Sequence, residues 1–340
     1  MKTILRTVLF GLMPVLTLPN LALAEQPIGI VIHGGAGTIN KAQMSASQQQ
    51  AYEVALTSAI EQGYTVLQQG GTSLDAVTRA VMVLEDSPLF NAGKGAVYTF
   101  EGNHELDASI MQGQDRKAGA VAGVTTIKNP ILLARAVMEQ SEHVMLAGNG
   151  AEAFADTLQL ARVPNSYYNT EFRYEALKRA RQALVPPPHQ ANISFDPAWR
   201  MGTVGAVAID KAGNLAAATS TGGMTAKRYG RIGDAPVIGA GNFADNSSCA
   251  VSATGHGEYF IRYQVASDIC ARVKYQGKSA ELAAAEVINE LALVGGTGGV
   301  IVVDPLGKLS WAFNTEGMYR AMLGSQTPLR VEIFSNHSAD

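Results

Sequence analysis

Threonines gather in two short stretches of the second half of the chain. Thr203 stands in Gly202-Thr203-Val204-Gly205, and more threonines occur in Thr219-Ser220-Thr221-Gly222-Gly223-Met224-Thr225. A threonine hydroxyl is a weak nucleophile that needs an adjacent base. A threonine at the start of a chain carries its own base, because its α-amine has a reference pKa of about 7.7–8.0. Nucleophilic chemistry at Thr203 would therefore require a cut of the bond before it.

The context of the Gly202–Thr203 bond suits such a cut. Residues 185–200 hold Pro186-Pro187-Pro188 and Pro197 without periodicity, so we expect a loop there, followed by a buried strand over 204–209. Glycine permits backbone geometry that other residues resist, which would let the Thr203 hydroxyl attack the preceding carbonyl. On spacing alone, these threonines could equally be β-branched residues of ordinary strands.

Glycine clusters raise a second hypothesis, nucleotide binding. Gly239-Ala240-Gly241-Asn242-Phe243-Ala244 matches the dinucleotide pattern, and Glu258 lies about 20 residues further on. That pattern needs a helix that begins at the second glycine. Here Asp245-Asn246-Ser247-Ser248 and a further expected strand follow instead. Nucleotide binding is therefore disfavoured.

The sequence shows no transition-metal pattern. It has no Cys-x-x-Cys and no His-Glu-x-x-His, and His104-Glu105 lacks a second histidine four residues on. Its two cysteines are Cys249, on an expected strand, and Cys270, on an expected helix. No pattern links them, so we expect two unpaired, buried thiols, although an oxidising compartment would allow a disulfide.

The elements that must position these residues follow from periodicity. We expect helices over 47–69, 73–87, 130–140, 152–161, 171–184, 259–275 and 280–293. We expect strands over 28–33, 96–100, 105–111, 119–126, 204–209, 215–220, 236–240, 249–253, 299–303 and 309–313. Runs of strands between groups of helices are not the alternation of a doubly wound sheet. They predict an α+β sandwich of two antiparallel sheets covered by helices.

Composition excludes several classes. Of the 340 residues 47% are hydrophobic and 16% charged, which is too apolar for a disordered chain. The 35 glycines show no three-residue period, so the chain is not collagen-like. The net charge is −3 without a basic block, which argues against nucleic acid as a partner.

Residues 1–24 have the three parts of a secretory signal peptide. Lys2 and Arg6 precede an apolar stretch at 8–18, and Ala22-Leu23-Ala24 is a small-residue cleavage site. The apolar stretch is shorter than the roughly 20 residues that a bilayer requires. We therefore expect an exported protein, periplasmic if its source is a Gram-negative bacterium, with no membrane association.

Seven motifs occur in an order that resembles one family. They are His33-Gly34-Gly35-Ala36-Gly37, Phe90-Asn91-Ala92-Gly93, His104-Glu105-Leu106-Asp107-Ala108, Gly202-Thr203-Val204-Gly205, Thr219-Ser220-Thr221-Gly222-Gly223, Gly230-Arg231-Ile232-Gly233-Asp234 and Thr254-Gly255. Together they resemble the plant-type asparaginase and isoaspartyl peptidase family of N-terminal nucleophile hydrolases, over residues 28–319. The resemblance implies an αββα four-layer sandwich. It also implies autoproteolysis between Gly202 and Thr203, which divides the chain into an α subunit (25–202) and a β subunit (203–340).

The resemblance implies roles for individual residues. Thr203 matches the nucleophile, and Thr221 the threonine that binds its hydroxyl. Thr254 and Gly255 match the oxyanion hole, where two donors face the developing charge. Asn91 matches a residue that supports the nucleophile.

Arg231 and Asp234 match the pair that binds the substrate's α-carboxylate and α-amine, which suits their charges. No cofactor is implied for catalysis, but a loop resembles one that binds a structural sodium ion, largely through backbone carbonyls. The loop residues are Leu84, Glu85, Ser87, Phe90, Ala92 and Lys94. A plain turn between a helix and a strand would have the same sequence pattern. One departure is His256, where many relatives have a second threonine.

The resemblance implies an amidohydrolase for L-asparagine and β-aspartyl dipeptides that forms an acyl-Thr203 intermediate, as a homodimer of αβ units. The first alternative is a glycosylasparaginase, which Thr203-Val204-Gly205 and the motif at 104–108 disfavour. The other is an exported nucleotide-binding protein.

Overall fold

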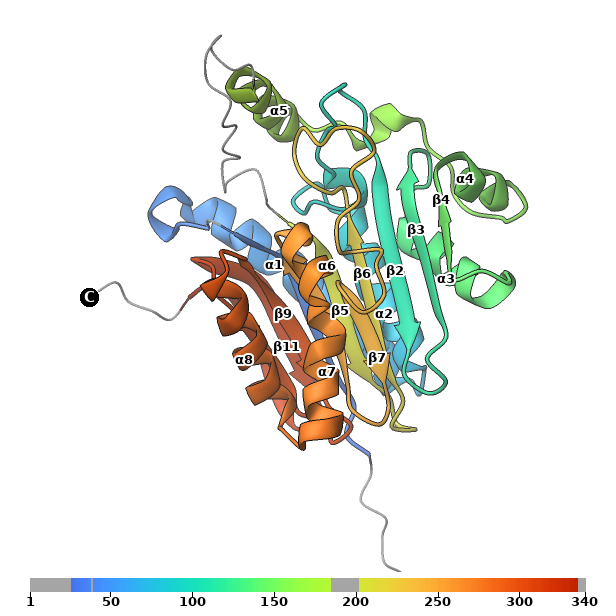
Figure 1. Cartoon of the computed structure of the whole chain (residues 1–340), viewed down its shortest axis with the longest axis vertical. Helices are drawn as coiled ribbons and strands as arrows, with labels where there is room; N and C mark the ends of the chain where they lie inside the picture. Colours follow the sequence, from blue (N-terminus) through green and yellow to red (C-terminus); the bar gives the residue numbers. More distant parts are fainter. Residues whose placement is uncertain (1–25, 38, 185–201, 336–340) are drawn as a thin grey trace, which may run out of the picture.

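The computed structural model describes residues 26–37, 39–184 and 202–335, whose strands form two sheets (Figure 1). The larger sheet has the order β12-β11-β1-β5-β6-β2-β3-β4. Its strands are β1 (Gly29–Gly37), β2 (Leu106–Gln112), β3 (Ala118–Val124), β4 (Met145–Ala147), β5 (Val204–Ile209), β6 (Leu215–Thr221), β11 (Gly317–Gly324) and β12 (Thr327–Phe334). Neighbouring strands are antiparallel except β3 and β4, which are parallel. The strand after Thr203, β5, therefore lies in the middle of the sheet, between β1 and β6.

The smaller sheet packs face to face on the larger one. Its antiparallel strands, in the order β10-β9-β8-β7, are β7 (Asn242–Asp245), β8 (Cys249–Gly255), β9 (Gly298–Val303) and β10 (Leu309–Phe313). Val31, Val207 and Ala217 of the larger sheet and Ile301 and Val303 of the smaller one belong to the core between them. Alternate residues of a strand point to one face, so each strand contributes every second side chain to this layer.

Helices cover the outer face of each sheet. α1 (Ala46–Gln68), α2 (Ser73–Asp86) and α3 (Pro130–Gln140) pack on the larger sheet. α7 (Val265–Gln276) and α8 (Ala280–Leu293) pack on the smaller sheet and lie in front of the strands in Figure 1. The other helices are α4 (Gly148–Asp156), α5 (Glu171–Leu184) and α6 (Gly257–Tyr263). The layers run helix, sheet, sheet, helix, so the predicted αββα sandwich is confirmed.

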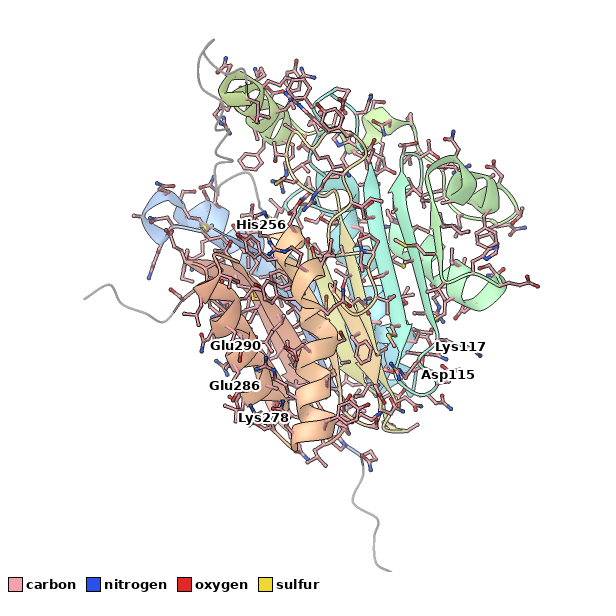
Figure 2. All side chains as sticks on the ribbon, viewed as in Figure 1. Asp115, Lys117, His256, Lys278, Glu286 and Glu290 are labelled. Atoms are coloured by element: carbon pink, nitrogen blue, oxygen red, sulfur yellow. A yellow bond between two sulfur atoms is a disulfide. The ribbon has the colours of Figure 1, made fainter. Side chains whose placement is uncertain are left out.

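Ion pairs join α7 to α8. Arg272 of α7 binds Asp268 of the same helix at 2.9 Å and Glu290 of α8 at 2.6 Å. Lys278, between the two helices, pairs with Glu286 of α8, and Figure 2 shows Lys278 near their lower end. Since these side chains are partly exposed, the pairs contribute little to stability individually, and apolar packing supplies most of the contact.

Some predicted elements are wrong. Residues 96–100 and 236–240 form no strand, because their backbone groups bond to loops: Val97 N–H donates to the Asn91 side chain and Phe100 N–H to the Lys227 carbonyl. The helix predicted over 259–275 is interrupted at Gln264, whose φ of 49° is left-handed. β11 and β12 were not predicted.

The expectation that the two cysteines are unpaired is also wrong. Cys249 begins β8 and Cys270 lies in α7, as predicted, but they form a disulfide with a Cα–Cα distance of 5.4 Å. α7 packs directly on β8, and this packing brings together two residues that are 21 positions apart. The sequence pattern does not contain that contact.

The predicted signal peptide and the predicted loop over 185–200 lie outside the described residues. The described part of the chain resumes at Gly202. Across 26–37, 39–184 and 202–335, no helix is long and apolar enough to cross a bilayer.

Candidate active site

Thr203 is held from three sides at the start of β5. It is 7% exposed, and its Oγ1 lies 3.2 Å from Oγ1 of Thr221 at the end of β6. Its N–H donates to Oγ1 of Thr254 on β8, at 3.3 Å. Its carbonyl lies 2.9 Å from Nδ1 of His33 on β1. Both sheets thus contribute to the position of the predicted nucleophile.

Sequence reasoning gave His33 no role, yet it lies under the nucleophile. A carbonyl can only accept, so Nδ1–H donates to Thr203, which leaves Nε2 to accept from Ser252 Oγ at 3.0 Å. Ser252 Oγ in turn lies 2.7 Å from Oγ1 of Thr219. Burial lowers the pKa of His33 to about 3, so the ring is neutral at working pH. A histidine that ends an apolar strand just before a glycine run was the available signal.

Gly202 has backbone geometry that fits a cleavage site. Its φ is 91°, in the left-handed region that side chains resist, and its carbonyl accepts a long hydrogen bond of 3.5 Å from the Thr221 hydroxyl. Gly35, with φ of 114°, approaches it so closely that a Cβ on Gly35 would lie 2.6 Å from the Gly202 Cα. Because neither residue has a side chain, β1 can pack closely against the Gly202–Thr203 bond.

Thr254 and Gly255 end β8 next to Thr203. Besides the Thr203 N–H, the hydroxyl oxygen of Thr254 accepts from Ala36 N–H at 3.4 Å. Gly255 lines the same pocket as Thr203, and a Cβ there would lie 2.4 Å from the Thr297 carbonyl, so only glycine fits. Thr254 and Gly255 therefore lie next to Thr203, Thr254 through a hydrogen bond to its N–H and Gly255 in the lining of the same pocket.

Arg231 lines the same pocket, but its side chain is already paired. Its Nε and Nη2 each lie 2.9 Å from an oxygen of Glu258, a residue whose role sequence reasoning missed. His256 Nε2 lies 3.2 Å from the same carboxylate, and Figure 2 shows His256 at the edge of the smaller sheet, where α6 begins. Burial would raise the pKa of Glu258, but the hydrogen bonds from His256 and Arg231 outweigh it and hold that pKa well below its usual range. An arriving carboxylate must therefore compete with Glu258 for Arg231.

Asp234 lines the pocket, and one oxygen of its carboxyl group, Oδ2, has no hydrogen-bond donor among the described residues. The residue is 4% exposed. Burial raises the pKa of Asp234 to about 7, although the charge of Arg231 opposes the shift. A substrate ammonium would supply the missing donor and a counter-charge.

Asn91 supports the pocket wall. Its Nδ2 donates to the Gly223 carbonyl at 2.7 Å, its Oδ1 accepts from Val97 N–H, and its carbonyl accepts from Gly222 N–H. It thus fixes the Gly222-Gly223 turn, directly after Thr221.

Two glycines of the predicted sodium loop pack closely against its backbone carbonyls. A Cβ on Gly93 would lie 2.3 Å from the Glu85 carbonyl, and a Cβ on Gly95 would lie 2.1 Å from the Phe90 carbonyl. The ammonium group of Lys94 is bound outside this loop, since its Nζ donates to the Tyr167 carbonyl. Within the described ranges no three or more His, Cys, Asp or Glu residues form a metal site, so a cation here would rely on carbonyls. The donor set fits a hard monovalent cation.

The glycine pattern at 239–244 serves packing. β7 occupies Asn242–Asp245 and leads into β8, so no helix within the described residues begins at the second glycine. A Cβ on Gly241 would lie 2.5 Å from the Asp234 carbonyl. The geometry that a pyrophosphate requires is therefore missing.

The chain is similar over most of its length to known proteins. The family model described as Asparaginase matches residues 25–332. An isoaspartyl peptidase of Escherichia coli K12 is 52% identical over 293 residues, which cover 86% of this chain and 91% of that protein. That of Salmonella typhimurium LT2 is 53% identical over 293 residues (86% and 94%), and a human isoaspartyl peptidase/L-asparaginase is 42% identical over 283 (83% and 88%).

Proposed function

The chain belongs to the asparaginase family, and from this premise we propose that it is an isoaspartyl peptidase with L-asparaginase activity. It hydrolyses the side-chain amide of L-asparagine and of β-aspartyl dipeptides. One observation carries the proposal: the Thr203 and Thr221 hydroxyls lie 3.2 Å apart in a pocket that Arg231 and Asp234 also line, while the Thr254 hydroxyl accepts from the Thr203 N–H behind it.

Activation is a cut of the chain by Thr203. The Thr203 oxygen attacks the Gly202 carbonyl carbon, the C–N bond breaks, and an ester joins the two residues. Water then hydrolyses the ester to a Gly202 carboxylate and a Thr203 with a free α-amine and hydroxyl. The left-handed φ of Gly202, which glycine adopts without a steric penalty, and the Thr221 hydroxyl on its carbonyl support this step. The product is an α subunit of 25–202 and a β subunit of 203–340.

Catalysis uses the group that the cut releases. The α-amine takes the Thr203 hydroxyl proton as the oxygen attacks the substrate's β-carbonyl carbon. The Thr254 hydroxyl and the Gly255 N–H stabilise the oxyanion. The amine then gives its proton to the leaving ammonia or amino acid, and water hydrolyses the acyl-Thr203 ester to release aspartate.

Recognition depends on the two charged residues. Arg231 binds the α-carboxylate in place of Glu258, and Asp234 binds the α-ammonium, which explains why its Oδ2 has no partner among the described residues beforehand. A glycosylasparaginase is not favoured, since the named relatives are isoaspartyl peptidases and asparaginases.

Three further features belong to the proposal. The carbonyls of the loop with Leu84, Glu85, Ser87, Phe90, Ala92 and Lys94 hold a sodium ion, which would neutralise their dipoles. Residues 1–24 direct export to a periplasm or equivalent space, in keeping with the disulfide, which persists in oxidising compartments. The αβ units form a homodimer.

A denaturing gel with intact-mass measurement tests the function. Wild type should give two fragments, the smaller beginning at Thr203, and Thr203→Ala a single uncut chain. Thr225→Ala, at a buried threonine of the neighbouring loop, is the matched control and should be cut normally. The cut enzyme should hydrolyse β-Asp-Leu but not a glycosylated asparagine. A wild-type protein that stays whole yet hydrolyses β-Asp-Leu would refute the mechanism.

A further inference from the structure

Arg173 is a buried cation that the proposed reaction does not use. It lies on α5, is 6% exposed, and donates from Nε to the Gly95 carbonyl at 2.9 Å and from Nη2 to the Leu89 carbonyl at 3.5 Å. Within the described ranges, no Asp or Glu forms an ion pair with it. Burial lowers the pKa of Arg173, but a guanidinium stays protonated in proteins. A buried charge without a counter-charge is costly, which implies that an anion joins it at some stage.

Arg173 and Gly202 line the same small cavity. The cavity measures about 10 Å³, close to the room that one water-sized group needs. Tyr52 and Tyr319, stacked at 4.2 Å, are the other titratable side chains among the described residues of its lining, and no described carboxylate lies there. Burial raises the pKa of Tyr319, so its ring stays neutral. Gly202 lines the substrate pocket as well, and it therefore separates the two spaces.

We propose that this cavity, the Arg173 cavity, binds the carboxylate that Gly202 acquires when the chain is cut. The inference rests on the proposed autoproteolysis, because Gly202 carries no charge before it. After hydrolysis one more oxygen stands on the Gly202 carbon, and the cavity has room for an atom of that size. The new anion would then supply the counter-charge that no described Asp or Glu provides for Arg173 in the uncut chain.

Capture of the carboxylate has a consequence for catalysis. The cut creates the Gly202 carboxylate beside the Thr203 α-amine. A carboxylate within about 4–6 Å favours the charged ammonium and so reduces the fraction of free amine that can act as a base. By binding the carboxylate in the Arg173 cavity, outside the substrate pocket, Arg173 keeps the Thr203 α-amine uncharged and able to act as a base.

Carbon-13 NMR on protein labelled at the glycine carboxyl carbon tests the proposal directly. In the cut enzyme the Gly202 carboxyl can be told apart, because every other glycine of the sequence is followed by another residue and its carbonyl is an amide. Its pKa should lie about one unit or more below the ordinary C-terminal value of about 3.3–3.7. In Arg173→Met it should return to that value, with Arg173→Lys between the two. An identical pKa in wild type and Arg173→Met would overturn the proposal.

Kinetics and stability separate this role from a merely structural one. The fraction cut is measured first by mass, so a failure to cut refutes the proposed function rather than this inference. In fully cut Arg173→Met, the acid limb of kcat should move up by about 0.5 pH units or more. Arg181→Met, on the same helix, should leave the limb in place. In the uncut Thr203→Ala background, Arg173→Met should not lower Tm, whereas in the cut enzyme it should.

The alternative source of the anion is the solvent. If free chloride occupies the Arg173 cavity, the acid limb should depend on whether chloride or gluconate is the counter-ion. The labelled Gly202 carboxyl should then titrate at its ordinary pKa. Either result would overturn the assignment to Gly202.

Discussion

The pH dependence of substrate capture should report the ionisation of Asp234. This carboxyl is buried, its Oδ2 is without a partner among the described residues, and burial raises its pKa to about 7. Only the carboxylate form attracts a substrate ammonium. Since kcat/KM reflects the free enzyme, it should fall as the pH decreases through this pKa.

The magnitude follows from the titration. With a pKa of about 7, roughly ten elevenths of Asp234 is ionised at pH 8 and one eleventh at pH 6. Asp234 alone should therefore reduce kcat/KM about tenfold between these values. The Thr203 α-amine, with a reference pKa of about 7.7–8.0, adds a second limb in the same direction. Asp234→Asn should remove one limb and keep the other, while the loss of a buried charge pair of about 2–5 kcal/mol lowers kcat/KM by 30-fold or more.

The assay is kcat/KM for β-Asp-Leu between pH 5 and 9 in wild type and Asp234→Asn. A β-amide of succinic acid, which lacks the α-ammonium, is the matched probe and should show only the α-amine limb in both proteins. A second readout is stability: a raised carboxyl pKa makes the unliganded protein lose stability as pH rises from the unfolded value toward 7, so Asp234→Asn should raise Tm at pH 8. The reasoning is refuted if wild type and Asp234→Asn have acid limbs of the same slope and position with β-Asp-Leu.

Three further predictions concern elements around the pocket. Replacing Cys249 and Cys270 by alanine should lower the free energy of unfolding by about 3 kcal/mol, since the disulfide closes a loop with a separation of 21 residues; denaturant titration measures the loss, and an unchanged midpoint would contradict it. His33→Ala removes the donor to the Thr203 carbonyl and one of the two partners of the Ser252 hydroxyl, so it should slow autoproteolysis and destabilise the fold by about 1–3 kcal/mol; a normal cutting rate by gel would exclude a positioning role. Dialysis from sodium into choline salts should lower Tm by about 2–4 °C with little change in kcat, because the proposed ion touches no reacting atom; equal Tm in both salts would exclude the site.

Local sequence patterns predicted much of the fold. α3 and α5 have the predicted bounds, Pro130–Gln140 and Glu171–Leu184, because their starts and ends depend on nearby residues. β5 and β6 follow the predicted hairpin for the same reason. The segments 96–100 and 236–240 look like strands by composition, but loop carbonyls and side chains bind their backbone groups instead.

The candidate site, like the fold, was predicted only in part from the sequence. Residue types raised Thr203 as a nucleophile, because the reaction needs an adjacent base, but only the resemblance of the ordered motifs to a family indicated Thr221, Thr254 and Gly255. Only the tertiary structure placed His33 under Thr203.

Tertiary structure alone also decided that Arg231 binds Glu258 before any substrate arrives, and that Cys249 reaches Cys270. It left Arg173 buried beside Gly202 without a carboxylate partner among the described residues. The physical reason is the same in each case. These contacts join segments distant in the chain, and their geometry depends on how two sheets and their helices pack, which short-range periodicity does not encode.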